Sequence, residues 1–231
     1  EMHKSKGNSL EFIEAANNMG VDAMRWVFAR HNPAQNLSFG YTSVEEVRRH
    51  FLLTLWNIYS FFTTYAIIDN FDPSQMAETA QESDVNMDNW IISELNSLIV
   101  AVTKSLDEYD STTAARNLEE FVELLSNWYV RRNRRRFWKS ENDEDKMSAH
   151  NTLYICLVTL AKLIAPITPF ISEELYQNLV RNADPEAPES VHLSRFPMAD
   201  AKKINHKLDS ATRLAMRISS MGRSARSKSG I

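Results

Sequence analysis

Cysteine, glycine and proline are scarce in this chain of 231 residues, which contains one, five and seven of them respectively. A single cysteine excludes an internal disulfide and any zinc cluster built from cysteines. Few turn-forming residues favour long helices over many short strands. No apolar run reaches the roughly 18 residues of a membrane span, and the first residues carry no secretory signal pattern. We therefore expect a helical protein of the cytoplasm that does not associate with membranes.

Negative charge is also scarce in two parts of a chain whose formal net charge is -4. Residues 127–140 hold five arginines and one lysine without any acid, and residues 202–231 hold eight lysines and arginines against the single acid Asp209. Charge segregation of this kind suits an anionic partner such as nucleic acid. The alternative is that these charges serve only solubility and helix ends.

Apolar residues make up 43% of the chain and aromatic residues 10%, which indicates a globular fold of one large or two small domains. The spacing of the apolar residues predicts helices over residues 42–69, 90–106, 111–138 and 148–164, another after Pro166 and Pro169, and a basic helix from residue 202 onwards. The polar stretch 71–88 indicates a surface connection, and residues 188–197 a short extended segment. Without an internal repeat or a strand–helix alternation, the expected fold is all-α, a helical bundle with one extended tail segment.

The basic stretch "NWYVRRNRRRFWKS" falls at the end of the predicted helix 111–138. At about 3.6 residues per turn, Arg131, Arg132, Arg135 and Arg136 continue the face that is apolar two turns earlier, and Arg134 lies outside it. This placement argues against a merely solvated face. The four arginines either pair with acids inside the bundle or line a groove that meets phosphate, for which the guanidinium fork is well suited.

An aromatic residue beside these arginines adds to the nucleic-acid interpretation. Trp128 is a candidate plane for base stacking, although a buried core position is the alternative. The pairs Arg213/Arg217 and Arg223/Arg226 in the last helix are weaker candidates for contact with a nucleic-acid backbone. The histidines are scattered without metal-ligand spacing, so we expect no metal ligand here, and any zinc would lie outside this chain.

Four ordered motifs carry a family resemblance that runs through essentially the whole chain. The first, "MHKSKGN", has the lysines, glycine and asparagine that can hold a polyphosphate, and it resembles the KMSKS signature loop of class I aminoacyl-tRNA synthetases. The others, "NWYVRRNRRRFW", "IAPITPFISEELYQNLV" and "ESVHLSRFP", are similar to the anticodon-binding helical bundle of class Ia members. Among these, the isoleucine-specific branch is more similar than the valine, leucine or methionine branches.

The resemblance implies a reaction and the residues that serve it. Isoleucine and ATP would give an aminoacyl-adenylate, and the isoleucyl group would then pass to tRNA(Ile). Lys4 takes the place of the lysine that stabilises charge as pyrophosphate leaves, and His3, Lys4, Ser5 and Lys6 would contact the ATP phosphates. The loop departs from the usual signature at Glu1 and His3, and Glu1 cannot donate to phosphate.

The resemblance also implies a domain organisation and a set of partners. Residues 1–20 would end a catalytic domain, residues 21–200 would form the anticodon-binding bundle, and residues 201–231 would begin a basic, truncated C-terminal region. Contact with tRNA would fall to Arg131, Arg132, Arg135, Arg136 and Trp128. ATP and isoleucine would bind through a catalytic domain that this monomeric fragment lacks, and the fragment alone is expected to form no adenylate.

Two alternatives remain at this stage. Within the same family, the chain could belong to a valine-specific relative, because the amino-acid pocket is not in this sequence. In a different class of protein, the bundle could be a helical interaction scaffold whose arginines pair with acidic helices and which binds no RNA. A phosphate-binding loop motif at the start of the chain argues against the scaffold.

Overall fold

The structure is a computed structural model that describes residues 10–75, 85–138 and 143–230, and the described residues form helices, turns and loops without a strand. The helices of the first half are α1 (Phe12–Met19), α2 (Val21–Arg30), α3 (Tyr41–Val47), the π-helical turn η2 (Arg48–Leu52), α4 (Leu53–Ile68) and the 3₁₀ turn η3 (Pro73–Gln75). Those of the second half are α5 (Asn86–Asp107), α6 (Ser111–Leu124), the π-helical turn η4 (Leu125–Val130), α7 (Arg131–Trp138), α8 (Asp143–Ile164), α9 (Pro169–Tyr176), the π-helical turn η5 (Gln177–Arg181), the 3₁₀ turns η6 (Val191–Leu193) and η7 (Ala201–Lys203), and α10 (His206–Lys228).

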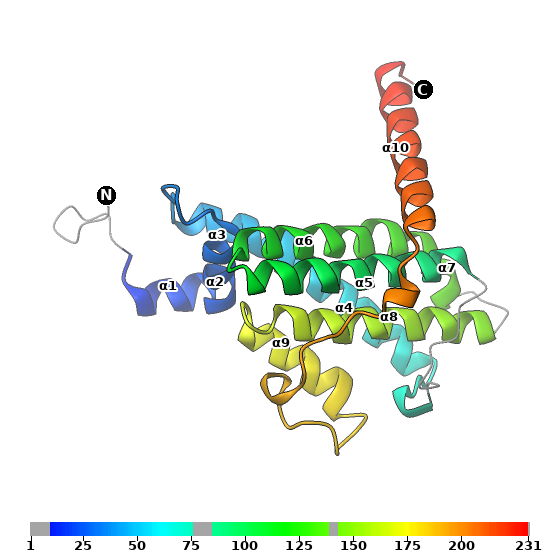
Figure 1. The fold of residues 1–231 in the computed structure, drawn as a ribbon, viewed down its shortest axis with the longest axis horizontal. Helices are drawn as coiled ribbons and strands as arrows, with labels where there is room; N and C mark the ends of the chain where they lie inside the picture. The colour runs from blue at the N-terminus through cyan, green and yellow to red at the C-terminus, as the bar shows by residue number, and fades with distance from the viewer. Residues whose placement is uncertain (1–9, 76–84, 139–142, 231) are drawn as a thin grey trace.

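The bundle is built around long helices that lie along one axis. Figure 1 shows α5, α6 and α8 side by side, with α4 behind them, α1 to α3 at one end and α9 below. The core takes its volume from large side chains that are fully buried, among them Trp26, Trp90, Tyr129, Tyr176, Phe51 and Phe137. At about 25 cal/mol per Å² of apolar surface, burial of such side chains is the main stabilising contribution.

The predicted all-α bundle is confirmed, and the predicted helix 111–138 is continuous through α6, η4 and α7. The apolar residues Trp90, Ile91, Leu95 and Val102 of the predicted helix 90–106 are all buried, so this helix packs its apolar side against the core. The predicted helix 42–69 is confirmed as the continuous helix of residues 41–68. Two other helices begin earlier than predicted: α5 at Asn86 instead of residue 90, and α8 at Asp143 instead of residue 148. The predicted extended segment 188–197 contains the turn η6 and otherwise runs as an irregular chain along the bundle to α10 (Figure 1).

The tight connection between α5 and α6 places an aromatic residue in an unusual backbone conformation. Tyr109 has φ 59° and a side chain that is 94% exposed. Its backbone N–H bonds to the Leu106 carbonyl at 3.0 Å, and the Asp110 N–H bonds to the Ser105 carbonyl at 2.7 Å. These two bonds define a Schellman motif, whose left-handed position is usually taken by glycine.

Two helical stretches have the length and composition of a membrane span, residues 41–68 and 144–164. The expectation that no apolar stretch would be long enough is therefore wrong by this criterion. Both stretches supply core residues, since Leu55 and Phe62 of α4 and Leu153 and Leu157 of α8 are buried. Their apolar character is thus used, at least in part, for packing within the bundle.

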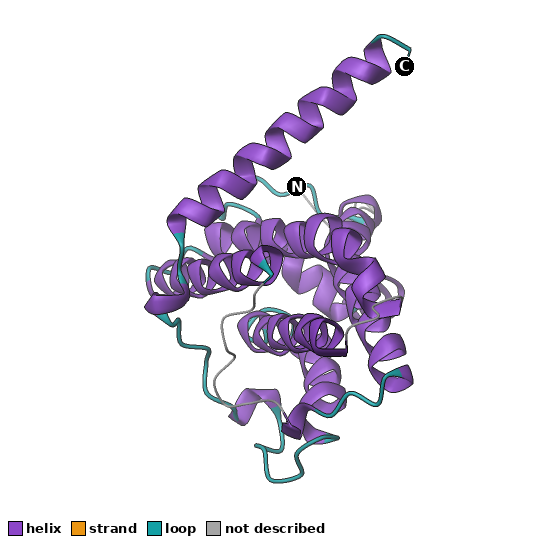
Figure 2. Cartoon of the chain, turned by 90° about the vertical axis from the view of Figure 1, so that its right-hand side faces the viewer, coloured by secondary structure: helices purple, strands orange, loops and turns teal. Residues whose placement is uncertain are grey.

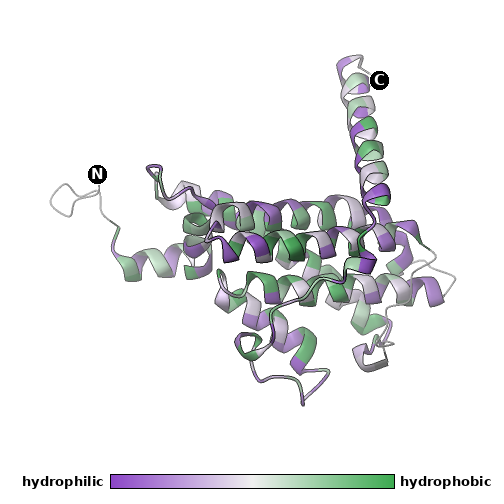
Figure 3. Ribbon diagram, in the orientation of Figure 1, coloured by the Kyte–Doolittle hydropathy of each residue, from purple (hydrophilic) through white to green (hydrophobic). Residues whose placement is uncertain are grey.

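The last helix, α10, rises steeply away from the bundle, as Figure 2 shows from a second direction. Figure 3 shows polar and apolar residues interleaved along its length. Near its start, α10 packs against α5, where Asp209 and Met216 are buried. Farther along, Leu214, Ile218 and Met221 are exposed.

Candidate nucleic-acid interface

A π-helical turn lies in the middle of the helix that carries the arginines, and it changes which side chains face the core. Upstream of η4 the buried residues include Leu118 and Phe121, and downstream they are Asn133 and Phe137. Hydrogen bonds from residue i to i+5 widen the turn, so each residue advances by a smaller angle than in an α-helix. A helical wheel with a constant angle is therefore out of phase after residue 125.

The expectation that four arginines continue the buried face is consequently wrong for three of them. Arg131, Arg132 and Arg135 are exposed, and only Arg136 is turned inward, with 13% of its side chain exposed. Arg131, Arg132 and Arg135 form no hydrogen bond or ion pair with the described residues. Three guanidinium groups are thus available to a partner, and one belongs to the protein interior.

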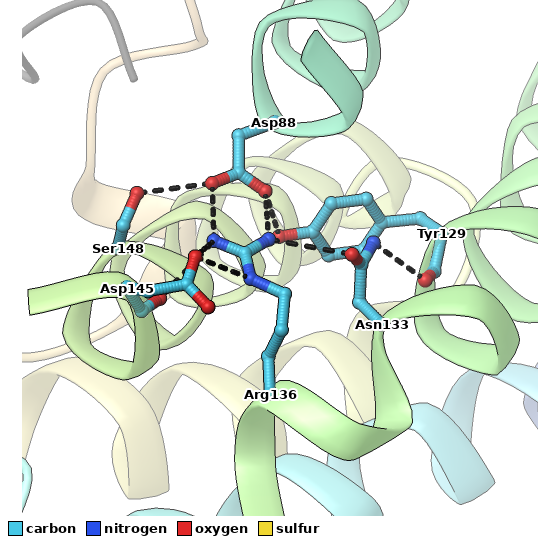
Figure 4. Close-up of polar contacts among 6 residues, drawn as sticks. All are labelled: Asp88, Tyr129, Asn133, Arg136, Asp145 and Ser148. Carbon is cyan, nitrogen blue, oxygen red and sulfur yellow. Dashed lines mark hydrogen bonds and ion pairs between the residues drawn. The ribbon is translucent and has the colours of Figure 1, made fainter. Parts of the chain in front are cut away.

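Arg136 is the centre of a polar network that joins α5, α7 and α8 (Figure 4). Its Nη1 and Nη2 donate to the two carboxylate oxygens of Asp88 at 2.6 and 2.9 Å, and its Nε donates to Asp145 at 2.8 Å. The Tyr129 hydroxyl and the Ser148 hydroxyl also donate to Asp88, at 2.8 and 2.9 Å. Of the two outcomes left open for the arginine stretch, Arg136 follows the first and pairs with acids inside the bundle.

Burial and charge pairing together set the ionisation of this network. Burial alone would lower the pKa of Arg136, but hydrogen bonds from the guanidinium to Asp88 and Asp145 outweigh it, so the pKa is raised. Burial, together with the Asp88 carboxylate, raises the pKa of Tyr129 well above its ordinary value. Arg136 is therefore cationic and Tyr129 neutral. The Asp88 side chain is only 1% exposed, and the guanidinium group of Arg136 compensates its buried charge.

Trp128 lies in η4 at the edge of a cleft between this helix and α10. The guanidinium carbon of Arg132 is 5.2 Å from the centroid of the Trp128 ring, and that of Arg223 is 5.8 Å from it. The cleft has a volume of about 770 Å³. It is lined by Glu123, Asn127, Trp128, Arg131, Arg132, Ser220 and Arg223. Trp128 is half-buried, so part of its ring is open to this cleft.

The root of α10 is fixed to α5 and α6 by polar contacts. Arg213 donates through Nε and Nη2 to the Glu94 carboxylate at 2.9 and 2.8 Å, and through Nη1 to Glu120 at 2.7 Å. Ser93 donates to Asp209 at 2.9 Å and accepts the backbone N–H of Asn205 at 2.7 Å. Arg213, a weaker candidate for nucleic-acid contact from the sequence, is thus engaged by two carboxylates of the bundle.

The structure joins residues that are about ninety positions apart in the sequence. It brings Arg223 to Trp128 and Arg132, a convergence that no local pattern of the sequence could predict because it depends on the angle at which α10 leaves the bundle. The exposed Arg217 and Arg226 do not line this cleft. The residues predicted for the ATP phosphates, His3, Lys4, Ser5 and Lys6, lie outside the described residues.

A second buried polar cluster joins the end of α4 to α8. His150 Nε2 donates to Asp69 Oδ2 at 2.9 Å, and Lys146 donates to Asp69 Oδ1 at 2.9 Å. Burial would raise the pKa of Asp69, but the hydrogen bonds from Lys146 and His150 outweigh it and the pKa is lowered. Burial lowers the pKa of His150, and its Nδ1 is buried without a hydrogen-bond partner. Within the described ranges, no group of three or more His, Cys, Asp or Glu side chains is placed to hold a metal ion.

A family model described as the anticodon-binding domain of tRNA ligase matches residues 88–231, which include the arginine helix and α10. The chain therefore belongs to this family, as its motifs predict. It is 56% identical over its whole length to an isoleucine–tRNA ligase of Dehalococcoides mccartyi and 45% identical to that of Thermus thermophilus. The chain spans 23% and 22% of the lengths of these relatives, so it corresponds to under a quarter of each.

Two solved structures share the fold at lower sequence identity. One is a LeuRS–tRNA–LeuAMS ternary complex from Agrobacterium radiobacter K84, with a TM-score of 0.65, 17% identity, and coverage of 88% of this chain and 23% of that one. The other is the Mycobacterium tuberculosis methionyl-tRNA synthetase with methionyl-adenylate, with a TM-score of 0.60, 19% identity, and coverage of 85% and 41%. Both likenesses concern the helical bundle and show a common fold.

Proposed function

We propose that this chain is the tRNA-binding part of an isoleucine–tRNA ligase and that it holds the anticodon arm of tRNA(Ile). The observation that carries the proposal is a set of exposed arginines without carboxylate partners among the described residues, Arg131, Arg132 and Arg135. Two of them, Arg131 and Arg132, line the cleft beside the partly open ring of Trp128. Guanidinium groups and an aromatic plane are the groups that single-stranded RNA engages through its phosphates and bases. The isoleucine specificity is supported by the 42–56% identity to isoleucine–tRNA ligases.

The whole enzyme would activate isoleucine with ATP and transfer it to tRNA(Ile) in the cytoplasm as a monomer. Within it, Lys4 would stabilise the charge of the leaving pyrophosphate, and His3, Ser5 and Lys6 would help to hold the ATP phosphates. Such catalysis depends on positioning and on charge stabilisation, without a protein nucleophile.

The division of labour along the chain follows the same proposal. Residues 1–20 would complete a catalytic domain, residues 21–200 would form the tRNA-binding bundle, and residues 201–231 would lead into a C-terminal region. The start of α10 at His206, close to the last of these boundaries, supports it because this helix leaves the bundle there. Arg136 is not included among the proposed tRNA contacts, since Asp88 and Asp145 occupy its donors.

Filter binding of the 231-residue chain to tRNA at several salt concentrations tests the proposal. Each phosphate contact should contribute about 0.7 to 0.9 to the slope of log affinity against log salt. We expect the affinity for tRNA(Ile) to fall steeply with salt and to exceed that for a non-cognate tRNA. Equal and salt-independent affinity for the two tRNAs would instead support the helical scaffold.

A further inference from the structure

The side of α10 that faces away from the bundle carries large apolar side chains in solvent. Leu214, Ile218 and Met221 are 56%, 61% and 69% exposed, although residues of these types are among those most often buried. At about 100° per residue, the three lie within roughly 60° of one another and about opposite Met216, which is buried where α10 packs against α5. We call Leu214, Ile218 and Met221 the outer seam of α10.

We propose that the outer seam is the docking surface for an amphipathic helix from another part of the same enzyme, a helix whose own apolar seam is flanked by aspartate and glutamate. The inference rests on the proposal that this chain is part of an isoleucine–tRNA ligase. It does not depend on where the tRNA binds, because the outer seam lies on the side of α10 opposite the bundle.

The spacing of the outer seam indicates that the partner is a helix. Positions 214, 218 and 221 are followed by Ala225, and the resulting 4-3-4 spacing is the pattern by which one helix packs against another. The seam is a narrow stripe along a single helix, and a second helix presents side chains at the same spacing and can interdigitate with it. A sheet or a loop has no such repeat.

The charges beside the outer seam indicate an acidic partner. Lys207, Arg217, Arg226 and Lys228 are exposed along this helix, and its one acid, Asp209, is buried on the bundle side. Charges that flank a helical seam select the partner by attraction and exclude others by repulsion. A second copy of α10 would place cations against cations, so pairing of two copies is disfavoured. RNA would use the cations but would leave the apolar seam in water.

The small size of the outer seam favours a partner within the same polypeptide. Stable complexes between separate proteins bury about 800 Å² on each partner, far more than three side chains on one helix can supply. Segments of one polypeptide meet at a high effective concentration, so a narrow contact is sufficient. This chain spans 23% of the length of the Dehalococcoides mccartyi relative, so more than three quarters of that protein lies outside the aligned segment.

The way α10 is held leaves it in need of such support. Contacts of Arg213 with Glu94 and Glu120 fix its root, and beyond Met216 none of the described residues of this helix is buried. Figures 1 and 2 show the helix standing away from the bundle over most of its length. Isolated helices gain most of their stability from the packing of an apolar face, and in α10 the apolar face beyond the root is the outer seam.

The first experiment introduces a photo-crosslinking amino acid at Ile218 of the full-length enzyme and identifies the linked peptide by mass spectrometry. We expect a link within the same polypeptide, outside residues 1–231, to a segment with helical apolar spacing and flanking acids. The same probe at Ser227, an exposed position of α10 roughly opposite the outer seam, is the matched control and should give little of this product. A link to a second copy, to a different protein or to tRNA, or equal yields at the two positions, would overturn the proposal.

Amide hydrogen exchange gives a second, independent measurement. Exchange in α10 should be about tenfold or more slower in the full-length enzyme than in the 231-residue chain. Ile218→Glu in the full-length enzyme should remove this protection, whereas Ser227→Glu adds the same charge away from the outer seam and should keep it. Equal protection in the two variants would show that no partner covers the seam.

Filter binding of tRNA(Ile) to the same preparations distinguishes this inference from the proposed function. If the unmodified enzyme binds tRNA and the probe at Ile218 gives no link within the polypeptide, the docking surface is wrong and the proposed function stands. If the link forms as expected but the 231-residue chain does not bind tRNA, the proposed function fails and the docking surface stands.

Discussion

At the scale of single residues, Tyr109 combines a sterically unfavourable backbone conformation with a solvent-exposed side chain. Tyr109 occupies a left-handed conformation at φ 59°, where a Cβ clashes with the backbone, yet its ring makes no core contact. The Schellman geometry, fixed by the bonds to Leu106 and Ser105, imposes the conformation. The unfavourable backbone conformation of Tyr109 is thus not offset by packing of its ring.

Tyr109→Gly should therefore raise the free energy of unfolding by about 1 kcal/mol, because glycine adopts this conformation without the Cβ clash. Urea denaturation followed by circular dichroism measures the change. Glu108→Gly, at φ -88°, provides the control and should lower stability, since there glycine adds only chain entropy to the unfolded state. A loss of stability in Tyr109→Gly would show that the exposed ring has a packing role.

Arg136 differs from Tyr109 because ion pairs with Asp88 and Asp145 hold its side chain in place. Its removal takes the paired guanidinium away from the buried Asp88, although the Tyr129 and Ser148 hydroxyls still donate to it. Arg136→Ala should therefore lower the free energy of unfolding by about 3 kcal/mol or more. Arg136→Lys should recover part of this, because one ammonium group cannot reproduce the two-pronged contact. Arg135→Ala, at an exposed position, should change stability by less than about 0.5 kcal/mol.

Measuring tRNA affinity as well as stability for Arg136→Ala and Arg135→Ala distinguishes a structural role, here called bracing, from contact with RNA. Arg136→Ala protein that stays as stable as the unmodified chain but loses tRNA affinity would refute the bracing role. We expect the reverse ordering, with Arg135→Ala affecting affinity and not stability.

His150 makes stability depend on pH. Its lowered pKa means that the folded state favours the neutral ring, and protonation at Nδ1 would create a buried N–H without an acceptor. This contribution is complete above the unfolded pKa of about 6.5 and is lost as the pH falls below it. Asp69, whose pKa is also lowered, adds a second loss below its ordinary pKa of 3.8.

Unfolding free energies measured between pH 7.5 and 5.5 test the first of these two windows. The unmodified chain should lose stability over this range, and His150→Gln, which can still donate to Asp69 but does not titrate, should lose less. His192→Gln, at an exposed position, should keep the unmodified profile. A His150→Gln variant with an unchanged profile would assign the pH dependence to another group.

At the scale of elements, the decisive features are the π-helical turn η4 and the anchored root of α10. The turn rotates Arg131, Arg132 and Arg135 outward and leaves Arg136 inside. The anchor then sets the second wall of the cleft opposite Trp128. Both elements act on the cleft by orienting the side chains that line it.

Arg213→Ala should loosen α10 while the bundle stays folded. Among the described residues, the buried Glu94 would keep only the Trp90 N–H, at 3.2 Å, as a partner. We expect the free energy of unfolding to fall by about 1–3 kcal/mol. Amide hydrogen exchange in α10 should become faster, with little change in α6 and α8. Arg217→Ala, one turn farther on and exposed, is the control, and equal exchange in the two variants would show that Arg213 is not the anchor.

At the scale of the whole molecule, an acidic chain presents a basic surface because its charges are segregated. The net charge of -4 coexists with unpaired arginines on α7 and lysines and arginines along α10. Repulsion between the remaining acidic surface and RNA phosphates would disfavour other docking orientations. The distribution of charge over the surface therefore indicates the kind of partner better than the net charge does.

Removal of two arginines from this surface should lower the salt dependence of tRNA binding by the amount expected for two phosphate contacts. Arg131→Ala combined with Arg132→Ala should reduce the log–log slope by about 1.4 to 1.8, since each phosphate contact contributes about 0.7 to 0.9. Lys104→Ala combined with Arg195→Ala removes two exposed charges outside the cleft and should leave the slope nearly unchanged. Equal slopes for the two double variants would place the tRNA elsewhere.

The sequence by itself determined the helical class, the continuous helix over residues 111–138 and the family, because apolar spacing and ordered motifs are local properties of the chain. It also located the arginine stretch and Trp128. Only the tertiary structure decided which arginines are free and which are held. A single π-helical turn shifts the phase of every later side chain, and the partners Asp88 and Arg223 are distant in sequence, so both outcomes depend on contacts that exist only in the packed fold.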